Sequence, residues 1–340
     1  MDSSAIVMNT LVFVFGGCCT NVLTLEDLIK DKNSDIGTLV TFTQFLFVAL
    51  SLLPGFVLFE GGMIRLKQLN VPLRVYIWSV ILFYISSSTN NSVFKYNISI
   101  PLHVVFRCFG TVITMIIGWL INKKRYSRLQ VISACLLTIG AIVTSLYRDH
   151  EFSLEAVHSW WVHKRYLAEK SDHQNDTTFL IGICLLVISS ISSALLSVYN
   201  EWTYKTYGKY WQENLFYTHF LSLPIFIVKD GTHIMTGYQQ LMGSSFRITR
   251  SHIAFALNII TQNICIRGVN ILASHTNALT LSVILTVRKF VSLLLSVVIY
   301  KNVLSYTSYV GVAIVFSGTL LYILGSRRPS SMVSSTKKSQ

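Results

Sequence analysis

Five positively charged side chains occur within long apolar runs of the sequence, and none of these runs contains a carboxylate. They are Lys95, Arg107, Arg267, Arg288 and Lys289. A charge surrounded by apolar side chains or lipid is costly unless a partner compensates it. The remaining partners are backbone carbonyls, water and an anionic ligand. The pattern favours a protein that binds a negatively charged ligand inside a membrane.

Arg288 and Lys289 are the strongest candidates for such binding. Arg288 is about 16 Å into an apolar run that begins near residue 277, and Lys289 is rotated about 100° from it around a helix. Arg can engage phosphate oxygens with two parallel hydrogen bonds, and Lys adds a point charge. We predict that the pair binds phosphate and that Arg107, about 12 Å into its own run, contributes from the other half.

Lys95 and Arg267 lie near the C-terminal ends of their apolar runs. They are candidates for a gate at the two membrane faces. The alternative is that they complement helix dipoles or extend their charged ends to the membrane surface. The sequence leaves both interpretations open.

Polar side chains in the apolar runs offer hydrogen bonds for the rest of a ligand. Tyr217 could stack on a base together with Phe216, and amides could read its edge. The alternative is that these side chains link neighbouring helices. The candidate binding residues are Gln44, Asn91, Tyr217, His219 and Asn263.

Signals of an enzyme are missing from the sequence. The apolar runs hold no carboxylate for acid–base catalysis, and no Cys or His grouping has metal-ligand spacing. We therefore expect no catalytic residue, no metal and no cofactor. All six cysteines fall in apolar runs, where we expect them to pack as small apolar side chains. They are Cys18, Cys19, Cys108, Cys135, Cys184 and Cys265.

The composition indicates that these residues are carried by membrane-spanning helices. Hydrophobic residues make up 52% of the chain and charged ones only 13%, too few for the surface of a soluble domain. A span needs about 20 apolar residues. The chain has a net charge of +13, but its sequence shows no polybasic tail or groove. We therefore expect no nucleic-acid partner. We predict an all-α membrane protein with spans at 5–25, 37–59, 74–94, 99–121, 129–147, 178–200, 213–228, 252–273, 277–300 and 304–324.

The charges between the runs predict the orientation of the chain. With both termini in the cytosol, the cytosolic segments hold thirteen cations and four acids, and the opposite face holds ten cations and eleven acids. An excess of Lys and Arg marks the cytosolic side. The sequon at Asn175 is then luminal and could be glycosylated.

Internal repetition divides the chain into two halves. Glu26 lies fifteen residues before Thr41, which begins Thr-Phe-Thr-Gln-Phe, and Glu201 lies fifteen residues before Phe216, which begins Phe-Tyr-Thr-His-Phe. Lys123 and Gly140 recur as Lys301 and Gly318. An odd number of spans per repeat places the second copy upside down, the arrangement of many transporters. We predict inverted five-helix repeats at 1–147 and 178–325, a luminal loop at 148–177 and a cytosolic tail at 326–340.

Several motifs resemble nucleotide-sugar transporters of solute carrier family 35, in the drug/metabolite transporter superfamily. The resemblance is strongest to the B branch, of the UDP-N-acetylglucosamine/UDP-xylose transporter type. It rests on Phe15–Val22, Val40–Phe47, Pro101–Arg107, Lys123–Ser127 and Val287–Ser292. It implies ten helices, residence in the Golgi or endoplasmic reticulum, and exchange of cytosolic UDP-sugar for luminal UMP. The implied sugars are UDP-N-acetylglucosamine first, then UDP-N-acetylgalactosamine or UDP-xylose.

The resemblance also assigns roles to single residues. Phe216–His219 matches a Phe-Tyr-Asn-Asn stretch that reads the base in relatives, and departs from it at both Asn positions. Lys289 matches a phosphate-binding lysine, and the preceding Arg288 is the B-branch form. Lys337 and Lys338 resemble a dilysine retrieval signal read by coat machinery. A carrier of another phosphorylated or sulfated anion, such as an adenylyl sulfate, and a non-transporting membrane scaffold are the alternatives. A monomer and a homodimer both remain open.

Overall fold

The computed structural model describes residues 3–30, 35–60, 63–93, 96, 106–146, 173–242, 250–300 and 305–327. The chain divides into two compact units, one of Met1–Ser88 with Leu195–Asn302 and the other of Thr89–Ala194 with Val303–Gln340. Each unit draws on both halves of the sequence. The division into repeats at 1–147 and 178–325 therefore describes the sequence and stays a prediction.

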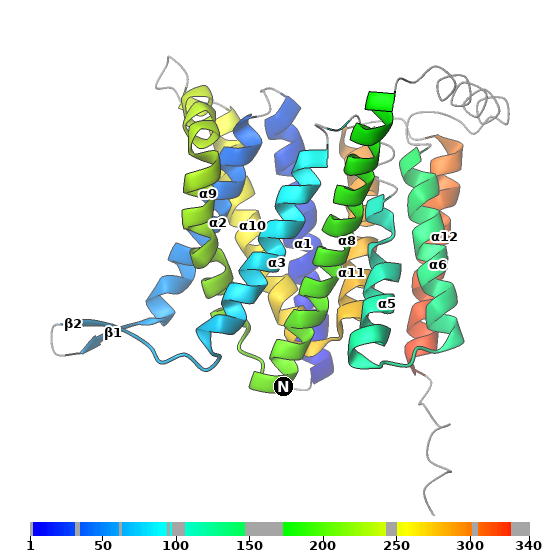
Figure 1. The fold of residues 1–340 in the computed structure, drawn as a ribbon, viewed down its shortest axis with the longest axis horizontal. Helices are drawn as coiled ribbons and strands as arrows, with labels where there is room; N and C mark the ends of the chain where they lie inside the picture. The colour runs from blue at the N-terminus through cyan, green and yellow to red at the C-terminus, as the bar shows by residue number, and fades with distance from the viewer. Residues whose placement is uncertain are drawn as a thin grey trace, which may run out of the picture. The chain divides into compact units, whose positions relative to one another are not determined.

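Every predicted span contains a helix (Figure 1). The first unit holds α1 (Ser3–Lys30), α2 (Asp35–Leu52), most of α3 (Leu73–Ser92), α9 (Trp211–Met242), α10 (Arg250–His275) and α11 (Ala278–Tyr300). The second holds α5 (Gly110–Asn122), α6 (Arg128–Leu146) and α12 (Tyr306–Arg327). Helix α8 (His173–Tyr207) begins in the second unit and ends in the first.

Seven of the described helices are long and apolar enough to cross a membrane. They are α1, α2, α6, α8, α10, α11 and α12. Large apolar side chains on these helices point away from the protein, for example Val298 at 75% and Leu320 at 63% exposure. Such surfaces are stable against lipid and unfavourable in water. The chain is a multi-pass membrane protein.

Helix α2 is shorter than the predicted span at 37–59. It ends at Leu52, and a 3₁₀ turn, η1 (Leu53–Gly55), follows with Pro54 near its start. The residue before a proline is disfavoured in the α-conformation, which explains the end. An antiparallel hairpin of β1 (Val57–Glu60) and β2 (Met63–Leu66) comes next, with Val57 opposite Leu66 (Figure 1). The predicted all-α class holds for the described residues as a whole, with this short hairpin between two helices.

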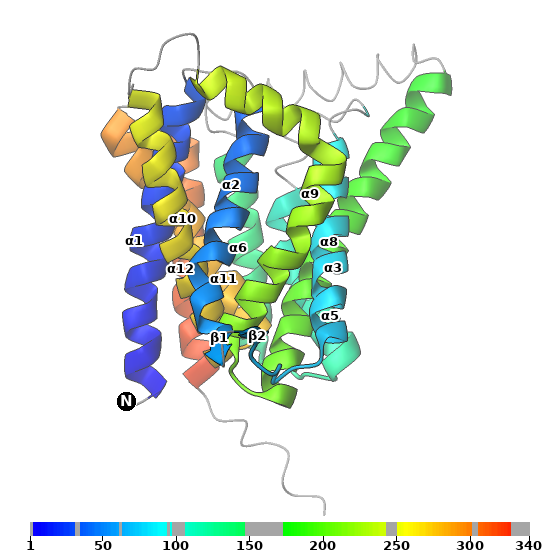
Figure 2. The same cartoon turned by 90° about the vertical axis from the view of Figure 1, so that its left-hand side faces the viewer.

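Helix α9 continues well beyond the predicted span at 213–228. It bends at Asp230, whose φ of −119° and ψ of 15° leave the helical region, and then continues to Met242. Figure 2 shows the part after the bend crossing the direction of the part before it. The segment between the spans predicted at 213–228 and 252–273 is therefore partly helical. A loss of apolar residues marks the end of a span and does not decide where the helix itself ends. Similarly, α8 begins at His173, within the loop predicted at 148–177.

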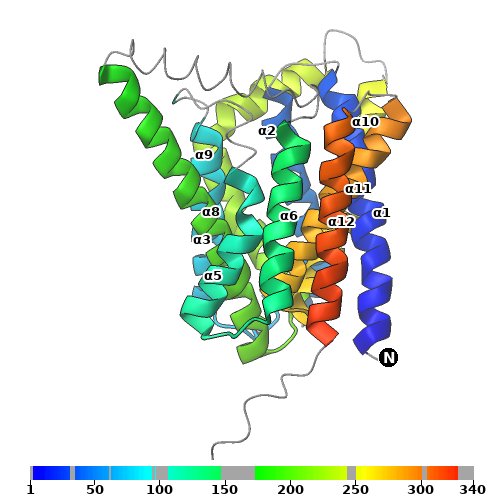
Figure 3. The same cartoon turned by 90° about the vertical axis from the view of Figure 1, so that its right-hand side faces the viewer.

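Glycines allow the closest helix contacts in both units. A Cβ atom on Gly17 of α1 would lie 2.9 Å from the backbone nitrogen of Cys265 in α10. In the second unit, a Cβ on Gly140 of α6 would lie 2.7 Å from the carbonyl oxygen of Gly311 in α12. Helices α6 and α12 accordingly lie side by side (Figures 1 and 3). Small residues at these positions let the backbones approach.

Candidate functional site

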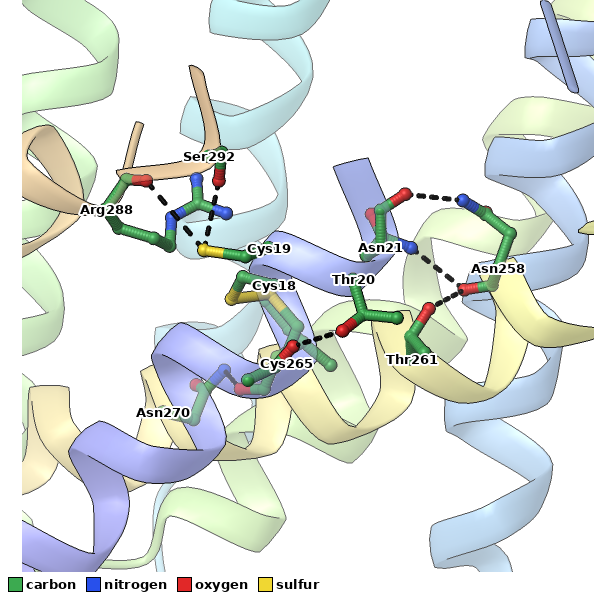
Figure 4. The surroundings of a disulfide bond; sticks show 12 residues. Cys18, Cys19, Thr20, Asn21, Asn258, Thr261, Cys265, Asn270, Arg288 and Ser292 are labelled. Atoms are coloured by element: carbon green, nitrogen blue, oxygen red, sulfur yellow. Dashed lines mark hydrogen bonds between the residues drawn. A yellow bond between two sulfur atoms is a disulfide. The ribbon is translucent and has the colours of Figure 1, made fainter. Parts of the chain in front are cut away.

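Arg288 lies on α11 where that helix faces α1. Its guanidinium Nε is buried and has no hydrogen-bond partner among the described residues. The nearby contacts involve other atoms: the Cys19 thiol faces the Arg288 carbonyl oxygen at 4.0 Å, and Ser292 Oγ donates to Cys19 Sγ at 3.1 Å (Figure 4). Lys289, the next residue, is exposed. Arg288 therefore keeps hydrogen-bonding capacity for an anion.

Carboxylates also occur within the spans, contrary to the sequence prediction. Glu201 is 4% exposed and lies in α8, inside the apolar segment Phe179–Tyr207. One of its oxygens accepts a hydrogen bond from Lys205 Nζ at 2.6 Å, and the other accepts from the Ala278 N–H at 2.7 Å. The prediction ended the span at residue 200 and counted Glu201 as a loop residue. The lysine and the start of α11 make its burial tolerable.

The predicted base-stacking residues are packed against other aromatic rings. Tyr217 is stacked on Tyr76 with ring centroids 5.3 Å apart, and Phe216 is stacked on Phe56 at 4.7 Å. Tyr217 is 8% exposed and Phe216 2%. In this conformation the protein covers both rings. A base could stack on either one only after these aromatic contacts separate, so their role in binding stays a prediction.

His219 belongs to α9 and faces α2. Its ring is 4.4 Å from that of Phe45, and its Nδ1 is 2.8 Å from the Leu215 carbonyl oxygen. A carbonyl oxygen only accepts hydrogen bonds, so Nδ1 carries the proton and neutral His219 presents Nε2 as an acceptor.

Gln44 belongs to a satisfied network that joins three helices. Its Nε2 donates to Asn258 Oδ1 at 2.6 Å. Asn258 Nδ2 donates to the Asn21 carbonyl oxygen at 3.0 Å and to Thr24 Oγ1 at 3.1 Å, and Asn21 Nδ2 donates back to the Asn258 carbonyl oxygen at 2.8 Å. Sequence reasoning missed Asn258, which is fully buried. The sequence signal that could have identified Asn258 is a single Asn within an apolar run.

Arg267 and Asn263, predicted for different roles, lie in one contact between α10 and α2. Arg267 Nε donates to Asn263 Oδ1 at 3.1 Å, and an Nη atom donates to Ser51 Oγ at 3.0 Å. No carboxylate takes part in these bonds. The arrangement ties the end of α2 to α10, and the gate role of Arg267 stays a prediction.

The remaining predicted residues belong to the unit that does not hold Arg288, or lie outside the described residues. Arg107 is exposed and belongs to the second unit. Asn91 lies at the end of α3, and Asn175 lies in the first turn of α8. Lys95, Lys337 and Lys338 lie outside the described residues. Among the residues that are described, no group of three His, Cys, Asp or Glu side chains is placed to hold a metal ion.

Cys18 and Cys265 form a disulfide that joins α1 to α10 (Figure 4). Their Cα atoms are 4.6 Å apart, and 247 residues separate them in sequence. The prediction that all cysteines act as packing residues is wrong for this pair. Gly17 lets the two helices approach closely enough for the bond. Cys19, Cys108, Cys135 and Cys184 take part in no disulfide among the described residues.

Comparisons with known proteins agree with the motif-based resemblance. The model of the UAA transporter family matches residues 6–326. A UDP-N-acetylglucosamine transporter of Saccharomyces cerevisiae is 49% identical over 333 residues, 95% of each chain. A UDP-xylose and UDP-N-acetylglucosamine transporter of Danio rerio is 35% identical, covering 93% of this chain and 94% of that one. The nucleotide sugar transporter SLC35B4 of Homo sapiens is also 35% identical, covering 91% of each.

The fold has a counterpart among solved structures. One crystal structure, 14% identical in sequence, superposes with a TM-score of 0.62 over 96% of this chain and 99% of that one. At this identity the match concerns the fold alone. The family model and the curated relatives both extend over nearly the whole sequence. The chain belongs to the UAA transporter family.

Proposed function

We propose that the protein exchanges cytosolic UDP-sugar, UDP-N-acetylglucosamine above all, for luminal UMP. The observation that carries the proposal is the buried Arg288 Nε, which has no hydrogen-bond partner among the described residues and lies next to Lys289, the residue that resembles the phosphate-binding lysine of relatives. A buried N–H donor needs such a partner, and a phosphate can supply one with one oxygen while a second oxygen binds another N–H of the guanidinium. The names of relatives up to 49% identical support the choice of sugar.

The proposal includes ten spans arranged as inverted repeats. Its support is the pairing of repeat-related helices: α2 packs against α9 within the first unit, and α6 against α12 within the second. These are the second and seventh spans and the fifth and tenth. A helix that contacts its own repeat equivalent lies beside the axis that relates the two repeats. Phe45 and His219 meet at the first of these seams.

Substrate uptake tests the proposal. Purified protein in UMP-loaded proteoliposomes is offered labelled UDP-N-acetylglucosamine, UDP-N-acetylgalactosamine, UDP-xylose, GDP-mannose and an adenylyl sulfate. UDP-N-acetylglucosamine is expected to enter fastest, and the GDP-sugar is excluded. Preferred uptake of the adenylyl sulfate would contradict the proposal, as would the absence of uptake by folded protein.

A further inference from the structure

The helix that carries Arg288 is attached near both of its ends by glutamates. At its start, the Ala278 N–H donates to Glu201 Oε2 of α8 at 2.7 Å. Near its other end, Ser296 Oγ donates to Glu26 Oε2 of α1 at 2.7 Å. All four residues belong to the first unit. The attachments are about 27 Å apart along the axis, with Arg288 about midway between them.

The contact of Glu201 does more than begin the helix. Asn277 already caps α11 locally, because its Oδ1 accepts a hydrogen bond from the Thr280 N–H at 2.8 Å. Glu201 binds a second of the free N–H groups of the first turn and places a carboxylate at the positive end of the helix dipole. Since Glu201 belongs to α8, this bond fixes where α11 starts relative to another helix.

The two glutamates are also related by the internal repetition. Each lies fifteen residues before its copy of the five-residue segment that contains Gln44 or His219. Glu201 is almost completely buried, and a carboxylate in such a place is expensive to maintain. An ionisable residue within a membrane span is a candidate for a functional role.

We infer that Glu201 and Glu26 are positioning residues that hold α11 at a fixed height so that Arg288 can reach the phosphates of the substrate. A binding group must be held to within about 0.5 Å of its productive position, and a shift of α11 by a single residue moves Arg288 by about 1.5 Å. Attachment at both ends resists such a shift. The inference rests on the proposed function.

A comparison of Glu201→Ala with Asn277→Ala tests the inference in proteoliposomes. Asn277→Ala removes the local cap and leaves the link to α8. We expect Glu201→Ala to raise the KM for UDP-N-acetylglucosamine and the inhibition constant of UMP by about tenfold, the scale of coupling within one network. Asn277→Ala should lower the melting temperature while KM stays within about twofold of wild type. Glu201→Gln keeps an oxygen that can accept from Ala278 and should recover most of the affinity.

A double-mutant cycle separates positioning from general destabilisation. If Glu201 acts through Arg288, adding Glu201→Ala to Arg288→Ala should weaken UMP inhibition no further. Additive losses, or a KM for Glu201→Ala equal to that of Asn277→Ala, would overturn the inference. Should Glu201→Ala fail to fold, Ser296→Ala, which removes the attachment to Glu26 at the other end, provides the same cycle. A wild-type protein that does not transport UDP-N-acetylglucosamine would instead contradict the proposed function.

Discussion

Arg288 shows how a single residue can indicate a ligand. A guanidinium has five N–H donors in a fixed plane, and here Nε is buried without a described partner. Ser292 Oγ donates to Cys19 Sγ, and the Cys19 thiol faces the Arg288 carbonyl oxygen, so neither contact involves the guanidinium. The free donor is therefore available to an anion that enters beside α11.

Replacing Arg288 by Ala should weaken UMP inhibition of UDP-N-acetylglucosamine uptake by about tenfold to a hundredfold, because a charged hydrogen bond contributes about 1.5–3 kcal/mol. Arg288→Lys should recover part of the loss, since it restores the charge without the planar fork. Inhibition constants measured on purified protein provide the test.

Lys229→Ala is the matched control for Arg288→Ala. Lys229 is exposed and donates to Ser88 Oγ at 2.8 Å on the same unit. Its removal should leave the inhibition constant of UMP unchanged, and inhibition by uridine should stay equally weak in every variant. If the inhibition constant of UMP in Arg288→Ala equals that of the wild type, Arg288 does not bind the phosphate.

The sequence identifies charged candidates more readily than their polar partners. Arg288 and Arg267 stand out because a cation in an apolar run is rare. Asn258 does not, because its importance lies in contacts with Asn21 and Gln44, more than 200 residues away. Glu201 was assigned to a loop, since the predicted span ended at residue 200. Such residues become visible only when the packing of the helices is known.

At the scale of helices, hydropathy finds the elements and fails at their ends. Each predicted span contains a helix, because about 20 apolar residues in lipid must satisfy their own backbone hydrogen bonds. The end of α2 depends on Pro54, and the bend of α9 depends on the backbone at Asp230. A count of apolar residues along the sequence reveals neither the early end of α2 nor the bend of α9. The disulfide could not be predicted from the sequence. To pair Cys18 with Cys265, one must know that α1 packs against α10 and which residues face each other there.

The disulfide predicts that the two halves of the chain remain covalently joined after a cut between them. A protease site inserted after residue 160 allows specific cleavage of the purified protein. The two fragments should migrate together without reductant and separate with it, because Cys18 and Cys265 lie on opposite sides of the cut. The two fragments of the cleaved Cys18→Ser variant should separate both with and without reductant. Separation of the wild-type fragments without reductant would contradict the bond.

For the whole molecule, the distribution of Lys and Arg predicts both termini in the cytosol. A tag at the C-terminus should be digested by protease in sealed microsomes, while a tag inserted in the luminal loop predicted at 148–177 should be protected. Glycosylation at Asn175 would agree, although its place in the first turn of α8 limits access. Protection of the C-terminal tag would reverse the orientation.

The dilysine in the tail at 326–340 predicts in which compartment the protein resides, and this prediction does not depend on the transport activity. If Lys337 and Lys338 are read by retrieval coats, replacing both by Ser should shift the protein from the endoplasmic reticulum towards the Golgi. Uptake per molecule should not change, since the tail lies outside the spans. Imaging of tagged protein measures the shift, and an unchanged distribution would make the two lysines an ordinary basic tail.

Exchange is the central claim, and trans-stimulation measures it most directly. Proteoliposomes are loaded with UMP, with uridine or with buffer, and the initial rate of labelled UDP-N-acetylglucosamine uptake is recorded. An antiporter returns to its outward-facing state faster when it carries UMP back, so UMP-loaded vesicles should show the highest rate and uridine should match buffer. Equal rates in all three preparations would contradict exchange of UDP-sugar for UMP.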